Sequence, residues 1–417
     1  MQGMQRSTGG GIGRIRGSFI PYRCARGWRG PGSGIAARSH LEADLQHLNP
    51  LWSTIDSRAK FYGVLDKLAE AGKCPPQLVA GFKDFYDNYA AAVTGSGAPG
   101  ADEAFATRVQ ATIADTVFAQ FVAPYTFPSL HTRILSPYDY YAFGQRYVGS
   151  LIDFGASALG NAAVFDEIEA RLAAGHNVVL LANHQTEADP GVFAHMLAAT
   201  HPRLAQEVIY VAGDRVVTDP LCKPFSMGRN LFCVHSKKHL DDVPELKAAK
   251  QETNRKTLVA MARALNEGGK LVWIAPSGGR DRPKADDTWM PDAFDPTAVE
   301  LMRNLLSRAK QPGHLYPLAM WSWRLMPPPK TVDKALGERR LTNYTGVGIS
   351  AAPELDVDAI VAPAGGDKDA AQRLLADAAL AAVRSEYAAL DRAITDPAWR
   401  ASQPQFSQPW ADKARRA

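Results

Sequence analysis

Short apolar runs alternate with helical segments along most of the chain after Pro124, and this alternation restricts the fold more than any other feature. Each run is five or six residues long, which is typical of strands. Amphipathic stretches such as 247–266 lie between the runs. The pattern predicts an α/β sheet covered by helices, in which ligands bind at strand ends and helix N-termini. The candidate strands are Val178–Ala182, Val208–Ala212, Leu271–Ala275, Leu315–Met320 and Val347–Ala351.

Residues 41–123 follow a helical pattern instead. Apolar side chains recur at helical spacing from Leu51 to Leu68 and from Leu78 to Tyr89, before a glycine-rich break at 95–100. This part has no cluster of His, Cys or paired carboxylates. We therefore predict a small N-terminal helical bundle at 41–123, with a role in packing or partner contact, and a larger α/β domain at 124–417.

The first 40 residues form a basic leader. They contain seven arginines and no acidic residue before Glu42, which is the composition of an organelle transit peptide; the alternative is a disordered basic tail. Without this leader Lys+Arg falls from 47 to 40 against 43 Asp+Glu, so the formal charge changes from +4 to −3. Nucleic-acid binding then loses its main electrostatic argument. The composition fits a chloroplast and a mitochondrial destination alike.

The remaining composition restricts the class of protein further. No apolar run approaches the roughly 18 residues that span a bilayer, so we expect no transmembrane segment and at most a peripheral contact with membranes. The four cysteines form no CxxC pair. Their spacing predicts neither a disulfide framework nor a zinc site.

His184 and Asp189 form an H-x4-D arrangement directly after the strand at 178–182. Residues five apart on a regular helix point about 140° away from each other. The two side chains therefore meet only if the chain turns at Asn183–Thr186. Asp189 would then orient the imidazole of His184 as a general base, with helix-start amides as oxyanion donors. The alternative is a loop histidine beside a helix-capping aspartate.

Two further strand ends carry potential phosphate ligands. Lys238 and His239 follow an apolar run, and Arg280 and Arg282 emerge from a Pro-Ser-Gly-Gly turn. Glycine lets a backbone approach an anion closely, and guanidinium groups bind phosphate with paired hydrogen bonds. Each cluster alone is more often a solvated surface than a binding site. Together with the histidine they predict a site for a hydroxylated phosphate monoester.

These segments resemble the soluble plastidial glycerol-3-phosphate acyltransferases. The matching stretches are NHQTEADP at 183–190, GRNLFCVHSKKH at 228–239, IAPSGGRDRP at 274–283 and YPLAM at 316–320. The resemblance implies that His184 is the base, that Asp189 is its partner, and that the phosphate is bound by Lys238, His239, Arg280 and Arg282. It also implies that the α/β domain is an acyltransferase domain with a mixed sheet. No metal and no cofactor are expected.

The implied reaction transfers a fatty acyl group to the sn-1 hydroxyl of glycerol 3-phosphate in the chloroplast stroma. The implied donor is an acyl carrier protein thioester or a coenzyme A thioester. A basic segment at Lys247, Lys250, Arg255 and Lys256 is a candidate dock for the acidic carrier, or simply a solvated helix face. The alternative functions are an sn-2 lysophosphatidate acyltransferase and a non-catalytic protein that binds lipid or acyl carrier.

Overall fold

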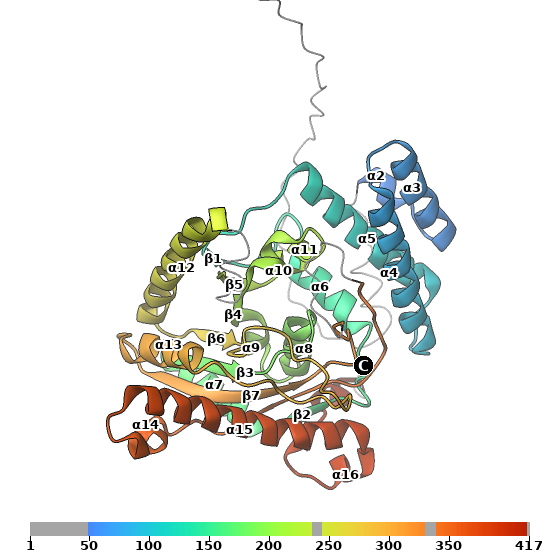
Figure 1. Ribbon diagram of the computed structural model, residues 1–417. Coiled ribbons are helices and arrows are strands. Elements are labelled where there is room, and N and C mark those ends of the chain that lie inside the picture. Colours follow the sequence, from blue (N-terminus) through green and yellow to red (C-terminus); the bar gives the residue numbers. More distant parts are fainter. Residues whose placement is uncertain (1–48, 236–243, 330–338, 415–417) are drawn as a thin grey trace, which may run out of the picture.

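A computed structural model describes residues 49–235, 244–329 and 339–414 of the chain. These residues form one sheet with helices on both faces and a group of helices at one side (Figure 1). The leader at 1–40 lies outside the described residues. In chain order the strands are β1 (Leu130–His131), β2 (Ala158–Gly160), β3 (Asn177–Ala182), β4 (Ile209–Ala212), β5 (Asn230–Cys233), β6 (Leu271–Ile274), β7 (Gly313–Trp321), β8 (Gly348–Ala351) and β9 (Phe406–Ser407).

The sheet is mixed, with a parallel centre. In the described part of the chain the strand order is β1-β5-β4-β6-β3-β7-β8-β2-β9. The strands from β5 to β7 are parallel to one another, whereas β1 and β8 run antiparallel to this central group. The carboxyl ends of β3, β4, β5, β6 and β7 therefore meet at one edge. This arrangement confirms the predicted fold class.

Each of the five predicted strands is present within two residues at either end. The sequence pattern missed four short strands of two to four residues, β1, β2, β5 and β9. Of these, β5 pairs with β4, the preceding strand, on one side and with the distant β1 on the other. A strand this short depends on its partners rather than on local periodicity, so the pattern alone could not reveal it.

The N-terminal helices differ from the sequence expectation in one respect. The apolar pattern from Leu51 to Leu68 is divided between α2 and α3, because Ser57 adopts an extended conformation. The helices are α2 (Pro50–Ser53), α3 (Arg58–Glu70), α4 (Pro76–Gly95), α5 (Glu103–Val122), α6 (Tyr140–Gly149), α7 (Ala162–Ala173), α8 (Asp189–Leu197), α9 (Pro202–Glu207), α10 (Asp214–Thr218), α11 (Lys223–Met227), η2 (Pro244–Leu246), α12 (Lys247–Glu267), α13 (Pro296–Ser307), α14 (Val357–Val361), η3 (Ala362–Ala364), α15 (Lys368–Thr395), α16 (Pro397–Ala401) and α17 (Pro409–Ala414).

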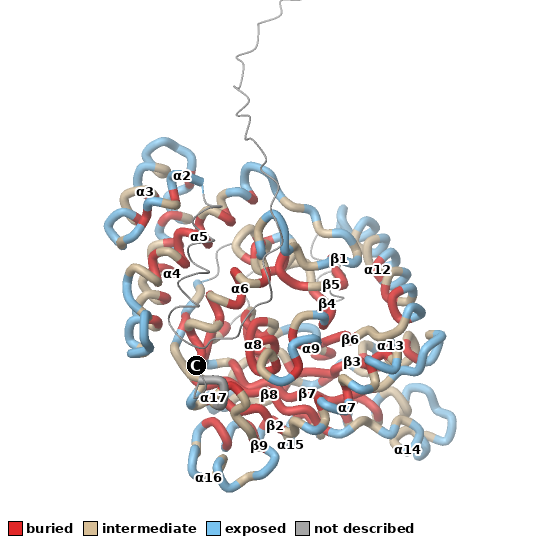
Figure 2. The backbone as a smooth tube through the Cα atoms, turned by 180° about the vertical axis from the view of Figure 1, so that it is seen from behind, coloured by how far each residue is buried: buried red, intermediate tan, exposed pale blue. Residues whose placement is uncertain are grey.

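Two hydrophobic cores cover the two faces of the sheet. Val178 and Leu180 of β3 lie in the core shared with α6, α8 and the N-terminal helices, whereas Val179 and Leu181 lie in the core shared with α13 and α15. All residues of β3 are buried, as expected for the central strand of a parallel sheet (Figure 2). The N-terminal helices thus continue the core of the larger domain. None of the described helices combines the length and the apolar character needed to cross a bilayer.

We expect Gly228→Ala to destabilise the fold. A Cβ at Gly228, between α11 and β5, would lie 2.8 Å from the amide nitrogen of Tyr141 and closer still to the carbonyl oxygen of Tyr140. Backbone atoms cannot move aside as a flexible side chain does, so we expect a loss of about 1–3 kcal/mol in unfolding free energy, measured in urea. Gly63→Ala in α3 is the control, because its Cβ meets open space and alanine favours the helix. Equal stability of the two variants would contradict the packing at Gly228.

Candidate active site

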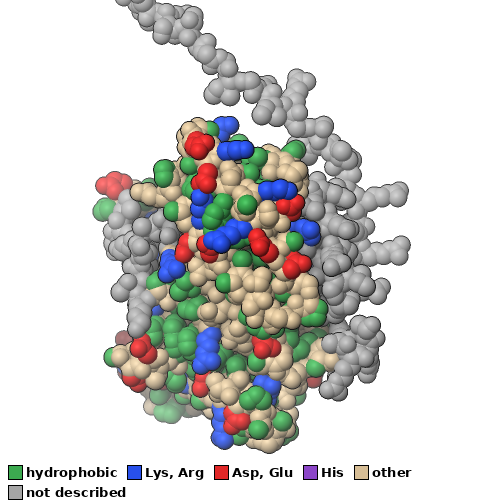
Figure 3. All heavy atoms as spheres, turned by 90° about the vertical axis from the view of Figure 1, so that its right-hand side faces the viewer, with side chains coloured by type: hydrophobic (Ala, Val, Ile, Leu, Met, Phe, Trp, Pro, Cys, Tyr) green, Lys and Arg blue, Asp and Glu red, His purple; other side chains and the backbone are tan. Residues whose placement is uncertain are grey.

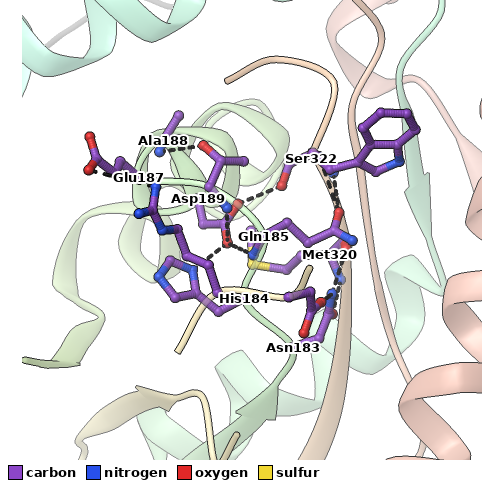
Figure 4. A network of polar contacts seen from close by, with 12 residues as sticks. Asn183, His184, Gln185, Glu187, Ala188, Asp189, Met320 and Ser322 are labelled. Atoms are coloured by element: carbon purple, nitrogen blue, oxygen red, sulfur yellow. Dashed lines mark hydrogen bonds and ion pairs between the residues drawn. The ribbon is translucent and has the colours of Figure 1, made fainter. Parts of the chain in front are cut away.

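His184 and Asp189 meet at the carboxyl end of β3. Residues 183–188 form no helix or strand, and α8 begins at Asp189 with Pro190 in its first turn. The chain turns back over this stretch, and Nδ1 of His184 lies 2.7 Å from Oδ2 of Asp189 (Figure 4). The His184 side chain is 26% exposed, whereas that of Asp189 is 1% exposed. The imidazole is therefore held from the buried side and open to solvent on the other.

The carboxylate of Asp189 is the centre of a hydrogen-bond network. Besides the imidazole, Oδ2 accepts hydrogen bonds from the amides of Gln185 at 2.7 Å and Thr186 at 3.3 Å. Oδ1 accepts a hydrogen bond from the hydroxyl of Ser322 at 2.5 Å, directly after β7 (Figure 4). A buried carboxylate with this many donors is held in one orientation. It can in turn hold the ring and tautomer of His184.

Three amides in the turn before α8 are already used and are not available as oxyanion donors in this arrangement. The amides of Gln185 and Thr186 donate to Asp189, and the amide of Ala188 donates to Oγ1 of Thr186 at 2.8 Å. These three amides therefore do not face a reacting carbonyl. The sequence could not reveal this, because a tight turn uses its own amides to close on the following carboxylate.

Glu187 lies in the loop 183–188 that carries His184, here called the imidazole loop, and it faces two arginines. NH1 of Arg280 lies 3.8 Å from Oε1 of Glu187, and Nε of Arg340 lies 2.9 Å from Oε2. Arg340 also pairs with Asp219 at 3.1 Å. Burial alone would raise the pKa of Glu187, but Arg340 and Arg280 outweigh it and the pKa is lowered. Glu187, Arg280 and Arg340 line a small recess beside the site, together with Met326 and Leu341.

The segment from 280 to 282 lies against the imidazole loop. The amide of Asp281 donates a hydrogen bond to the carbonyl oxygen of His184 at 2.6 Å. Asp281 is completely buried, whereas Arg280 and Arg282 on either side are partly exposed. The two strand-end loops that the sequence predicted to converge are thus in direct main-chain contact. Lys238 and His239 lie outside the described residues.

Several residues of this network carried no predicted role. Asn183, Glu187 and Asp281 lie inside the quoted motifs, and their proximity to the predicted site residues was the available signal. Ser322 and Arg340 lie far along the chain and outside any motif, so only the fold reveals them. In the described part of the chain, no cluster of three or more His, Cys, Asp or Glu residues is arranged to hold a metal ion.

Family models and similar sequences among known proteins both point to glycerol-3-phosphate acyltransferases. A family model described as acyltransferase matches residues 164–321, and one described as glycerol-3-phosphate acyltransferase N-terminal matches residues 52–125. A chloroplastic glycerol-3-phosphate acyltransferase of Cucurbita moschata is 43% identical over 91% of this chain and 84% of its own length. The corresponding proteins of Arabidopsis thaliana and Spinacia oleracea are 43% and 41% identical, over 83% and 86% of this chain and 76% and 77% of theirs.

The buried carboxylate of Asp281 predicts a pH dependence of stability. Burial raises its pKa to about 7, against about 3.9 in an unfolded chain. The folded state holds this proton more tightly, so the stabilising contribution is present below about pH 4 and is lost as the pH rises to about 7. Asp281→Asn removes this contribution, and its unfolding free energy in urea should fall less than that of the unmodified protein between about pH 5 and about pH 8. Asp286→Asn, an exposed change in the same loop, should keep the original slope.

Proposed function

Because the chain belongs to the glycerol-3-phosphate acyltransferase family, we propose that it transfers a fatty acyl group from a thioester to the sn-1 hydroxyl of glycerol 3-phosphate. The product is 1-acyl-glycerol 3-phosphate and the released group is the donor thiol. The observation that carries this proposal is the hydrogen bond between His184 and Asp189, on a loop bonded to the main chain between Arg280 and Arg282. The main-chain contact between Asp281 and His184 supports a shared site for the proposed base and the two arginines.

His184 acts as the base in this proposal. Asp189 accepts the hydrogen on Nδ1, which leaves the lone pair of Nε2 for the substrate hydroxyl. As Nε2 takes the hydroxyl proton, the oxygen attacks the thioester carbonyl and forms a tetrahedral intermediate. The carbon–sulfur bond then breaks, and the imidazolium returns the proton to the leaving thiolate. The negative charge of Asp189 stabilises the imidazolium in between.

The phosphate group binds to Arg280 and Arg282, with Lys238 and His239 as the further proposed ligands. The carboxyl end of β5, which precedes the last two, lies at the same edge of the sheet as the ends of β3 and β6. Arg280 already faces the carboxylate of Glu187, which Arg340 also binds. Arg340 can neutralise Glu187 when Arg280 turns to a phosphate, so the binding of substrate leaves no buried carboxylate without a cation.

We further propose an acyl carrier protein thioester as the preferred donor and the plastid stroma as the compartment. The relatives are named chloroplastic. Helix α12 exposes Arg255 and Lys256, which pair with Glu252 on the same helix, together with Leu258 and Val259. An acidic carrier that competes with Glu252 for the two cations fits this face. Lys250 does not contribute to this face, since it is 13% exposed and 4.0 Å from Asp214. Figure 3 shows the side of the molecule opposite α12, where acidic and basic side chains intermingle.

Two substitutions should separate catalysis from substrate binding. His184→Ala should lower kcat by a factor of roughly 100 to 10,000, the usual range for a general base, while glycerol 3-phosphate still binds in calorimetry. Arg280→Ala should mainly raise KM for glycerol 3-phosphate by about tenfold or more. His176→Ala is the matched control, because His176 lies just before the amino end of β3. Near-normal turnover of His184→Ala would refute the proposed role.

Reversal of charge on α12 should affect the protein donor selectively. The double variant Arg255→Glu and Lys256→Glu should raise KM for the acyl carrier protein thioester several-fold and leave KM for the coenzyme A thioester nearly unchanged. Arg373→Glu on α15 is the control for a charge change on another exposed helix. An equal effect on both donors would argue against docking on α12.

A further inference from the structure

The alternation of side chains around Asp281 determines where the two arginines point. Arg280 and Arg282 are partly exposed, and Asp281 between them is fully buried. Successive side chains in a non-helical stretch tend to point to opposite sides. The buried side chain of Asp281 therefore places both arginine side chains on the opposite side of the loop, where Arg280 is 13% exposed and faces Glu187.

The main chain of Asp281 also fixes the separation between this loop and the proposed base. Its amide donates to the carbonyl oxygen of His184 at 2.6 Å, so the two loops are bonded at the residue that carries the imidazole. A displacement of Asp281 would therefore displace Arg280 and Arg282 relative to His184.

The carboxylate of Asp281 holds the contact between Asp281 and His184 in place through two further hydrogen bonds. Oδ2 accepts a hydrogen bond from Nδ2 of Asn183 at 3.0 Å, and Oδ1 accepts one from the amide of Asp292 at 3.0 Å. Asn183 in turn donates to the carbonyl oxygen of Met320 at 3.0 Å and accepts from its amide at 2.8 Å. The ends of β3, β6 and β7 are thus joined through two buried side chains, Asn183 and Asp281.

The burial of the Asp281 carboxylate costs free energy that an uncharged residue would not cost. Asp281 makes no proposed contact with substrate. Its two oxygens serve two donors on different segments, one in the imidazole loop and one in the loop that follows the arginines. A residue in this place acts on the geometry of its neighbours rather than on the reacting atoms.

We propose that Asp281 is a positioning residue that sets the distance between the phosphate-binding arginines and His184, and thereby selects which hydroxyl of glycerol 3-phosphate is acylated. This inference rests on the proposed function. The two hydroxyls sit on adjacent carbons, which are joined by a bond of about 1.5 Å. A misplacement of about 1 Å can cost about 100-fold in rate. The distance between the phosphate-binding arginines and His184 is therefore sufficient to distinguish the two hydroxyls.

Asp281→Asn tests the proposal with little change in volume. The amide offers one acceptor oxygen where the carboxylate offers two, so one of the two hydrogen bonds is lost. We expect kcat to fall by about 10- to 100-fold, KM for glycerol 3-phosphate to change much less, and the share of 2-acyl product to rise several-fold. Product isomers are measured in acid-quenched reactions, because acyl groups migrate. Asp286→Asn in the same loop is the control, since Asp286 is exposed and its side chain accepts hydrogen bonds from Thr288 at the surface.

The product ratio keeps the test decisive even if the variant folds poorly. Unfolded molecules make no product, so the ratio of isomers reports only on folded enzyme. A ratio equal to that of the unmodified protein would overturn the inference, whatever happens to kcat, because a merely structural role lowers the rate without changing the preferred hydroxyl. If the unmodified protein itself makes no acylated product, the proposed function fails instead.

Discussion

The site depends on the burial of one carboxylate. Asp189 is 1% exposed and accepts four hydrogen bonds, from His184, Gln185, Thr186 and Ser322. A carboxylate so far from water is tolerable only with donors around it. Three of these donors lie in the turn between β3 and α8, and the fourth follows β7. The same requirement that satisfies the charge therefore closes the turn and holds the imidazole.

The parallel centre of the sheet brings the loops that follow β6 and β7 close to Asp189. The carboxyl ends of β3, β6 and β7 lie at one edge because their strands are parallel neighbours. Side chains then join the ends: Asn183 bonds to Met320 and Asp281, and Gln185 accepts hydrogen bonds from the amides of Ser322 and Trp323. Polar residues that are buried between loops thus do for the site what apolar residues do for the cores.

Much of the fold was predictable because its signals are local. The five main strands are apolar runs of ordinary length, and α8 begins where an aspartate and a proline follow one another. The break between α2 and α3 and the short strands β1, β2, β5 and β9 were not predictable. The break depends on the backbone conformation of Ser57, and the short strands depend on pairing with their neighbours in the sheet.

The sequence alone determined the chemistry of the candidate site: an imidazole with a carboxylate five residues later, and paired arginines after a glycine turn. The sequence reveals these residues because each motif is a contiguous stretch of the chain. Only the tertiary structure decided which amides are already used by Asp189, that Ser322 and Arg340 reach the site, and that Asp281 lies beneath the arginines. Such contacts join segments up to about 150 residues apart, and hydrogen bonding depends on distance and direction in space, which local sequence patterns do not encode.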